Sequence, residues 1–165
     1  MYKLNNIIPF TGGNSSSKHL VSDLNKNFNI QLNISLTNIA CIESSSPNRL
    51  LKTAIDLHRQ MDGIGFLQMT ESNQKLFNSI KKIKELESMS LFFPEISDIS
   101  PRLQEELFLF IKNNPATHLF FIFGSTIPFS ELKKKFLIVK EFQVLAKKVI
   151  QLDNSLIKIL DISTS

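Results

Sequence analysis

The sequence predicts a three-layer α/β domain with a mainly parallel sheet of five strands. Short apolar runs that suit buried strands alternate with amphipathic patterns that suit helices, which is typical of this architecture. An acidic residue, Glu95, follows one of the apolar runs. Open α/β sheets bind ligands at the carboxyl ends of their strands, so Glu95 is a candidate functional residue. We expect residues 1–165 to form a single domain with one core.

Composition excludes several classes of protein. Apolar residues make up 42% of the chain, which excludes a disordered protein. No apolar run reaches the roughly 18–20 residues of a membrane helix, and the apolar stretch near the start is too short for a secretory signal. A single cysteine, Cys41, rules out an internal disulfide framework and favours a reducing cytosol. We therefore expect a cytoplasmic protein with no membrane partner.

The net charge of +4 permits contact with nucleic acid or with an acidic protein. The basic residues are scattered, however, and the one run, Lys133–Lys135, is more typical of a solvated helix face. The 14 phenylalanines fall mostly in apolar runs and are expected in the core rather than as base-stacking platforms. Direct DNA binding is therefore not expected.

The segment from Ser90 to Ile111 carries the strongest local signals. It begins with a buried strand around Leu91–Phe93, and Glu95 and Asp98 follow in a tight loop. Ser100 and Pro101 then favour a helix start, because serine caps a free backbone N–H and proline already has a helical φ. The residues expected on the buried face of this helix are Leu103, Leu107, Phe108 and Ile111, and Asn113-Asn114-Pro115 should end it.

A second candidate site lies near the start of the chain. A first strand over 6–10, the loop Thr11–His19 and a helix over 20–25 have the layout of a phosphate-binding loop, G-x-x-x-x-G-K-[ST]. Gly12 and Lys18 keep the required spacing, whereas Ser17 replaces the second glycine and His19 the hydroxyl residue. A simple turn before a helix is the alternative. The candidate nucleotide-binding residues are Gly12, Gly13, Ser15, Ser16, Ser17, Lys18 and His19.

Patterns along the rest of the chain complete the expected elements. Strands are predicted over 29–36, 117–123 and 149–152, with 39–42 extending the core and a glycine turn leading into a short strand near Phe66. Helices are predicted from Pro47, over 74–87 and over 129–136, and 156–160 is either a strand or a short helix. His58 has no partner at metal-ligand spacing, so we expect it to be exposed or satisfied by a hydrogen bond.

The segment Ser90–Ile111 resembles the Walker B region of the AAA+ ATPase domain of bacterial sigma-54-dependent transcription activators. The matching residues are Leu91, Phe92, Glu95, Ile96, Asp98, Leu103, Gln104 and Leu107. The run from Thr11 to Val21 is similar to the phosphate-binding loop of the same family, and the two motifs come in the family's order. The resemblance covers about Ile8 to Leu152. It implies a P-loop NTPase-like fold, an AAA+ core, with ATP and Mg²⁺ as cofactors.

The resemblance also implies roles for particular residues. Glu95 would polarise the attacking water, and Thr126 aligns with the polar residue that positions this water. Asp98 is the candidate metal ligand. Gly65 and Phe66 fall where the family carries its sigma-factor loop, although a glycine turn before a strand is the alternative.

Departures from the family pattern favour binding over turnover. Pro94 replaces the acid that organises magnesium, and no arginine follows Arg102 to stabilise the charge on the transferred phosphate. The sequence also leaves no room for the helical lid of the family. We expect a degenerate domain that binds a protein partner or its own copies in bacterial transcription or signalling. The alternatives are an ATP-binding switch or residual ATPase that uses Lys18 and Glu95, and a nucleic-acid-binding module.

Overall fold

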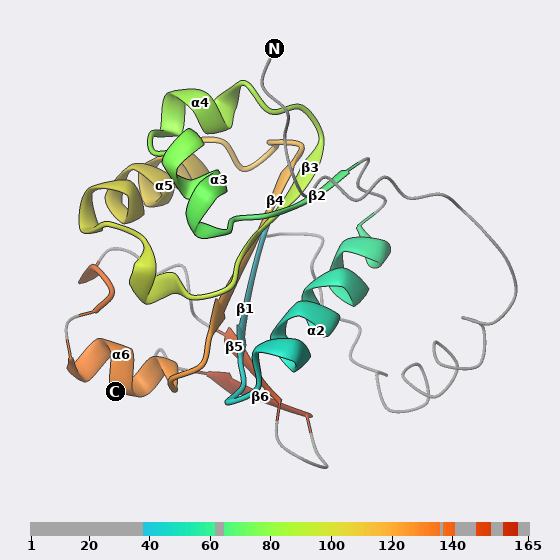
Figure 1. Ribbon diagram of the computed structural model, residues 1–165, viewed down its shortest axis with the longest axis vertical. Coiled ribbons are helices and arrows are strands. Elements are labelled where there is room, and N and C mark those ends of the chain that lie inside the picture. Colours follow the sequence, from blue (N-terminus) through green and yellow to red (C-terminus); the bar gives the residue numbers. More distant parts are fainter. Residues whose placement is uncertain (1–37, 62–64, 136, 141–147, 153–156, 162–165) are drawn as a thin grey trace, which may run out of the picture.

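The computed structural model describes residues 38–61, 65–135, 137–140, 148–152 and 157–161 (Figure 1). The strands predicted over 6–10 and 29–36 lie outside these ranges, as does the loop Thr11–His19. The segment 39–42, predicted only to extend the core, forms the strand that lies between β4 and β5 in the sheet.

The described chain forms one sheet in the order β2-β3-β4-β1-β5-β6. Its strands are β1 (Ile39–Glu43), β2 (Gly65–Gln68), β3 (Met89–Phe93), β4 (Leu119–Ser125), β5 (Lys148–Leu152) and β6 (Ile157–Asp161). The first five are parallel to one another, and β6 pairs antiparallel with β5 at one edge. The prediction of an α/β domain with a mainly parallel sheet is confirmed. The predicted number of five strands is wrong, because the described sheet has six. The additional antiparallel strand, β6, is the segment that the sequence left open between strand and helix.

Helices cover both faces of the sheet (Figure 1). On one face, α2 (Pro47–Gln60) packs its leucines on the strands. The other face carries α3 (Glu71–Leu76), α4 (Ile80–Lys84), α5 (Pro101–Asn113) and α6 (Phe129–Lys134). The chain moves across the sheet in one direction from β1 to β2 and in the opposite direction from β2 through β3 and β4 to β5. Because crossovers between parallel strands are right-handed, this reversal puts α2 on the opposite face from the later helices.

The start of α5 follows its local sequence. Ser100 Oγ accepts a hydrogen bond from the N–H of Leu103 at 3.3 Å, and Pro101 is the first helical residue. All four residues predicted on the inner face of this helix are buried. The predicted helix start, apolar face and helix end are therefore confirmed.

The single helix predicted over 74–87 is wrong. The structure has two short helices there, α3 and α4, with a break at 77–79. Glu106 of α5 supplies the physical reason, because its Oε2 accepts the N–H of Ile80, the first residue of α4, at 3.2 Å. A carboxylate at this place satisfies a backbone donor that a helix start leaves free and favours a new start at this residue.

The core is rich in aromatic side chains. All seven residues of β4 are buried, as expected for a central parallel strand. The rings of Phe93 and Phe123 stack with centroids 5.2 Å apart, and Phe121 stacks on Phe123 at 6.2 Å. Cys41 lies in this core, where burial raises the pKa of its thiol to about 12.

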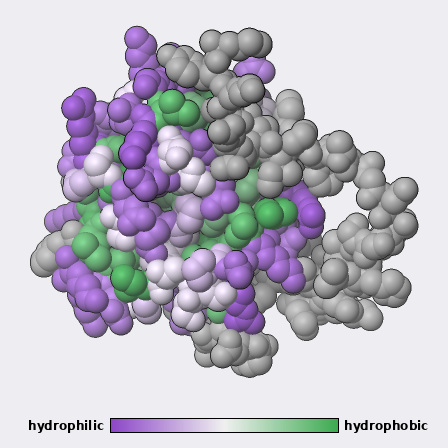
Figure 2. All heavy atoms as spheres, in the orientation of Figure 1, coloured by the Kyte–Doolittle hydropathy of each residue, from purple (hydrophilic) through white to green (hydrophobic). Residues whose placement is uncertain are grey.

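Hydrophilic residues cover most of the described surface in Figure 2, and hydrophobic residues form small separate patches. Leu109 and Leu137 are the large apolar side chains that stand out as exposed among the described residues. Within the described ranges, none of the helices has both the length and the apolar character needed to cross a membrane.

Candidate functional site

The candidate site lies at the carboxyl ends of β1, β3 and β4, which meet at one edge of the sheet because the strands are parallel. We call this region the carboxyl edge and define it by residues 43–46, 94–98 and 125–128. The chain leaves β1 toward the face covered by α2, and leaves β3 and β4 toward the opposite face. The connections therefore diverge between β1 and β4, which is where open α/β sheets form their binding crevice.

The two residues predicted to act in catalysis, Glu95 and Thr126, are in direct contact. The N–H of Thr126 donates to Glu95 Oε2 at 2.8 Å, and the Thr126 hydroxyl donates to the same oxygen at 2.7 Å. The structure thus brings together an acid that follows β3 and a threonine that follows β4. The contact joins the ends of these neighbouring strands.

The second oxygen of Glu95 is also engaged. Ser97 Oγ lies 3.1 Å from Glu95 Oε1, and Ser125 Oγ lies 3.0 Å from it. Ser125 Oγ is also 2.6 Å from the carbonyl oxygen of Ile127, so its one proton serves two acceptors. Both oxygens of Glu95 therefore accept hydrogen bonds from the surrounding turns.

Gly124 allows the Glu95 turn to lie close to β4. A Cβ added at Gly124 would lie 2.7 Å from the carbonyl oxygen of Pro94, which is closer than Cβ atoms normally approach a neighbouring atom. The glycine is needed here because the backbone of the neighbouring turn fills the space of a side chain. Pro94 thus takes part in the backbone packing that sets the position of Glu95.

A small cavity of about 190 Å³ opens beside Thr126, between the ends of β1, β4 and β5. Its lining comprises Glu43, Ser44, Ser45, Thr126, Pro128, Gln151 and Leu152. Glu43 is only 5% exposed, and its Oε2 accepts the N–H of Phe129, the first residue of α6, at 2.9 Å. Glu43 thereby connects the end of β1 to the start of α6.

Sequence reasoning missed Glu43 and the serines after it. A signal was present, because the apolar run 39–42 ends in an acid and is followed by Ser46-Pro47. The same order of apolar run, acid and Ser-Pro helix start occurs from Leu91 to Pro101. In both places an acid at the end of a strand precedes the helix that leaves the carboxyl edge.

Asp98, the candidate metal ligand, lies in a short 3₁₀ turn, Ile96–Asp98. Partial burial raises the pKa of the Asp98 carboxyl, and the negative charge of Glu95 adds to this effect. Among the described residues, no group of three or more histidines, cysteines and acids is arranged to hold a metal ion. A metal role for Asp98 stays a prediction.

The other predicted site residues, Gly12, Gly13, Ser15, Ser16, Ser17, Lys18 and His19, lie outside the described ranges. Their role in nucleotide binding also stays a prediction.

Within the described sheet, the strand between β4 and β5 is β1. It is followed by Ser44–Ser46 and by the start of α2 at Pro47.

Comparison of the chain with protein-family models finds no match, and comparison with curated proteins and with solved structures finds no significant one.

Proposed function

We propose that the chain is a degenerate P-loop-like α/β domain, similar to the AAA+ core of sigma-54-dependent activators, that acts by binding a protein partner without hydrolysing ATP. The hydrogen-bonded state of Glu95 is the main support. The strand order, with parallel strands and helices on both faces, is compatible with a P-loop-like fold. Bacterial transcription or signalling is the setting that the sequence resemblance suggests.

Both carboxylate oxygens of Glu95 are engaged in hydrogen bonds within the protein. A catalytic base must present a carboxylate oxygen to the water that it activates. Here Oε2 accepts two hydrogen bonds from Thr126, and Oε1 lies within hydrogen-bond distance of two serine hydroxyls. Hydrogen bonds to a charged group contribute about 1.5–3 kcal/mol each. Freeing the carboxylate of Glu95 to activate a water would therefore require breaking several of these hydrogen bonds.

The connection after β1 also lacks the groups that bind phosphate. It consists of Ser44, Ser45 and Ser46 and contains neither glycine nor lysine. A phosphate-binding loop uses glycines for its backbone conformation and a lysine for the β and γ phosphates. Pro47 at the start of α2 further removes one backbone N–H from this helix end.

A calorimetric titration with ATP and Mg²⁺ tests this proposal against the nucleotide-switch alternative. We expect no saturable heat for the wild-type chain, and no difference for Lys18→Ala or for the nearby control Lys26→Ala. Saturable binding that Lys18→Ala abolishes and Lys26→Ala retains would favour an ATP-binding switch. In that case Lys18 would contact phosphate and Glu95 would face the water.

A further inference from the structure

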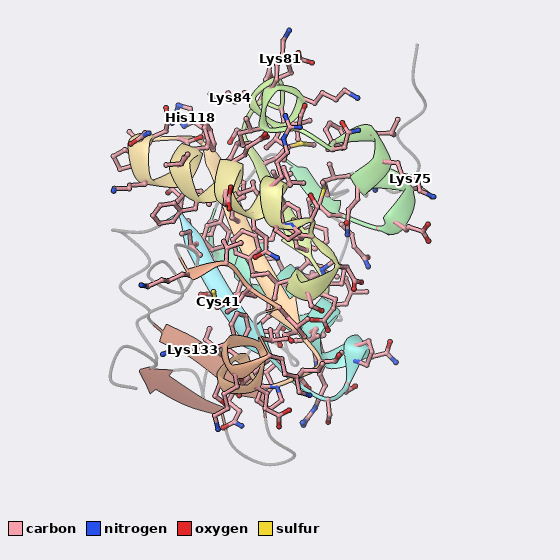
Figure 3. All side chains as sticks on the ribbon, turned by 90° about the vertical axis from the view of Figure 1, so that its left-hand side faces the viewer. Cys41, Lys75, Lys81, Lys84, His118 and Lys133 are labelled. Carbon is pink, nitrogen blue, oxygen red and sulfur yellow. The ribbon has the colours of Figure 1, made fainter. Side chains whose placement is uncertain are left out.

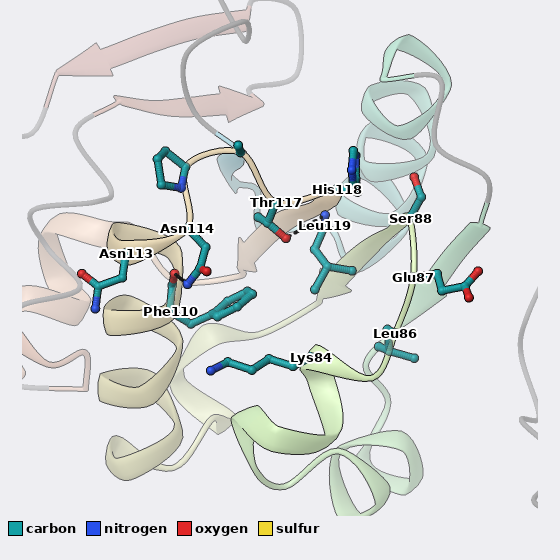
Figure 4. Close-up of a pocket in the computed structure, with 12 residues that line it drawn as sticks. Lys84, Leu86, Glu87, Ser88, Phe110, Asn113, Asn114, Thr117, His118 and Leu119 are labelled. Carbon is teal, nitrogen blue, oxygen red and sulfur yellow. Dashed lines mark hydrogen bonds between the residues drawn. The ribbon is translucent and has the colours of Figure 1, made fainter.

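A groove of about 770 Å³ opens beside the starts of β3 and β4, at the edge of the sheet opposite to the carboxyl edge. Figure 4 shows the residues that line it. We call it the α4–α5 groove, because it lies between the connection that follows α4 and the end of α5. The loop 115–118, which leads into β4, completes its lining. Its volume lies within the range of about 300–1,000 Å³ that is usual for ligand pockets.

The groove has an apolar floor and a polar rim. Phe110 and Leu119 are buried and point into the groove, and Leu86 adds to its apolar lining (Figure 4). Exposed Asn114 and His118 belong to the rim. An apolar centre surrounded by polar groups is the usual anatomy of a protein-binding surface.

Lysines make this end of the molecule basic. Lys81, Lys82 and Lys84 are exposed on α4, and no ion pair involves them within the described part of the chain. Lys75 and Lys135, by contrast, each pair with a glutamate one helical turn away. The positive charge of α4 therefore remains available to a partner.

Lys84 combines this charge with the apolar floor. Its Nζ lies 5.2 Å from the centroid of the Phe110 ring, so the ammonium group borders the groove. Figure 3 shows Lys81, Lys84 and His118 at the same end of the molecule. Three acids lie near these lysines: Glu87 in the groove lining, Glu85 on the same connection, and Glu106, which contacts the start of α4 and pairs with Arg102. The four lysines Lys81, Lys82, Lys84 and Lys112 outnumber them. An occupant with negative charge and aliphatic side chains would complement both features.

We propose that the α4–α5 groove binds a segment of a partner protein that carries acidic and aliphatic side chains. A second copy of this chain complements the groove less well, because the chain itself has a net charge of +4. Nucleic acid would use the lysines but not the apolar floor. The inference rests on the proposed binding function for the existence of a partner, and it uses no residue of the carboxyl edge.

Fluorescence polarisation with the full chain tests this inference. The probes are fluorescein-labelled synthetic peptides in which leucine alternates with aspartate or glutamate. Matched peptides carry lysine in place of each acid or serine in place of each leucine, and a labelled DNA duplex serves as the nucleic-acid probe. Lys84→Glu reverses a charge at the groove, and Lys52→Glu makes the same change on α2, across the sheet. Ala116→Trp fills the groove with a large ring.

We expect the acidic leucine peptides to bind the wild-type chain and both matched peptide sets to bind more weakly. Lys84→Glu should lower the affinity by about tenfold, because a like charge at an interface opposes binding. Ala116→Trp should also weaken binding, and Lys52→Glu should leave it unchanged. Equal affinities for Lys84→Glu and Lys52→Glu would overturn the inference. So would binding of DNA alone, or no saturable binding by any acidic peptide.

The two proposals fail in different ways. Loss of peptide binding to the groove would leave the result of the ATP titration unaffected. ATP binding through Lys18 would in turn not change the effect of Lys84→Glu on the affinity for the peptides. A chain that binds the peptides and also hydrolyses ATP would keep the groove and overturn the proposal for Glu95.

Discussion

Glu95 Oε2 accepts two hydrogen bonds from Thr126, one from its N–H at 2.8 Å and one from its hydroxyl at 2.7 Å. The contact joins the ends of β3 and β4, strands that are neighbours in the sheet but far apart in sequence. A carboxylate in this position satisfies a backbone donor that the end of the sheet leaves unpaired. We therefore expect Glu95 to contribute mainly to stability.

The first prediction concerns Glu95→Gln. The amide has one acceptor oxygen in place of two, so some of the donors around it lose their partner. We expect a loss of about 1–3 kcal/mol in the free energy of unfolding, measured by urea denaturation. The control Glu105→Gln changes an exposed acid on α5 and should stay within about 0.5 kcal/mol of wild type.

A double-mutant cycle with Thr126→Val assigns this loss to the contact. Valine keeps the backbone N–H and removes the hydroxyl, so the single variant should lose about 1 kcal/mol. The two substitutions together should cost less than the sum of their separate effects. Additive losses, or no loss in Glu95→Gln, would show that the contact contributes nothing to stability.

The second prediction uses two glycines that differ in their surroundings. Gly124→Ala puts a Cβ against the backbone oxygen of Pro94, which cannot move without shifting the Glu95 turn. We expect a loss of about 1–3 kcal/mol. Gly65→Ala meets the side chain of Met89, whose flexible methyl end, 3.0 Å away, can rotate aside, while its Cγ at 3.5 Å is an ordinary contact. Thermal unfolding should show a clearly lower Tm for Gly124→Ala than for Gly65→Ala, and equal values would contradict this packing.

The third prediction concerns Gln104, a buried residue of α5. Its Nε2 donates to the carbonyl oxygens of Ile99 at 2.9 Å and Leu137 at 3.2 Å, and its Oε1 accepts the N–H of Val139 at 2.9 Å. Gln104 thereby joins the turn after Glu95 to the segment that follows α6. Gln104→Leu would leave these backbone groups without a partner, and we expect a loss of about 3 kcal/mol or more in urea denaturation.

The matched control is Gln60→Leu, which makes the same change at an exposed position at the end of α2. It should alter the free energy of unfolding by less than about 0.5 kcal/mol. A similar effect of both substitutions would mean that the backbone contacts of Gln104 do not stabilise the fold.

The fourth prediction is a pH dependence at His58. Its Nδ1 lies 2.9 Å from Ser90 Oγ, and its ring packs near Phe66 with centroids 5.5 Å apart. Burial lowers the pKa of His58, and the charge of Arg59 adds to this effect. The unfolded chain then takes up a proton near pH 6.5 that the folded chain resists. The contribution of His58 to the free energy of unfolding is therefore fully present above pH 6.5 and is lost as the pH falls below this value.

Urea denaturation of wild type and of His58→Gln between about pH 7.5 and pH 5.5 measures this effect. The loss of unfolding free energy on acidification should be smaller in the variant, which cannot titrate at this position. Identical pH profiles would show that the pKa of His58 is the same in the folded and unfolded chains. The substitution can also lower the free energy of unfolding by the same amount at every pH. Comparing the shapes of the two pH profiles separates that loss from the pH-dependent effect of His58.

Local signals predicted the second half of the fold well. The strand near Leu91, the helix start at Ser100-Pro101 and the apolar run of β4 each depend on neighbouring residues, and the structure has all of them. That Glu95 and Thr126 lie at the same edge of the sheet could also be predicted, because both residues follow parallel strands. The satisfied state predicted as one outcome for His58 is the one observed.

Non-local contacts explain what the sequence did not predict. The place of β1 between β4 and β5 depends on pairing with residues about 80–110 positions later. The break between α3 and α4 depends on Glu106 from another helix. Glu43 was missed because its importance comes from the start of α6, which no local pattern connects to the end of β1.

The central claim is that the domain binds a protein partner and does not hydrolyse ATP. A measurement of phosphate release from ATP in the presence of Mg²⁺ tests this claim most directly. The wild-type chain, Glu95→Gln and Lys18→Ala should all release phosphate at the rate of a heat-denatured control, because Glu95 is held by Ser97, Ser125 and Thr126. Turnover by the wild-type chain that disappears in Glu95→Gln, while the variant remains folded, would contradict the account.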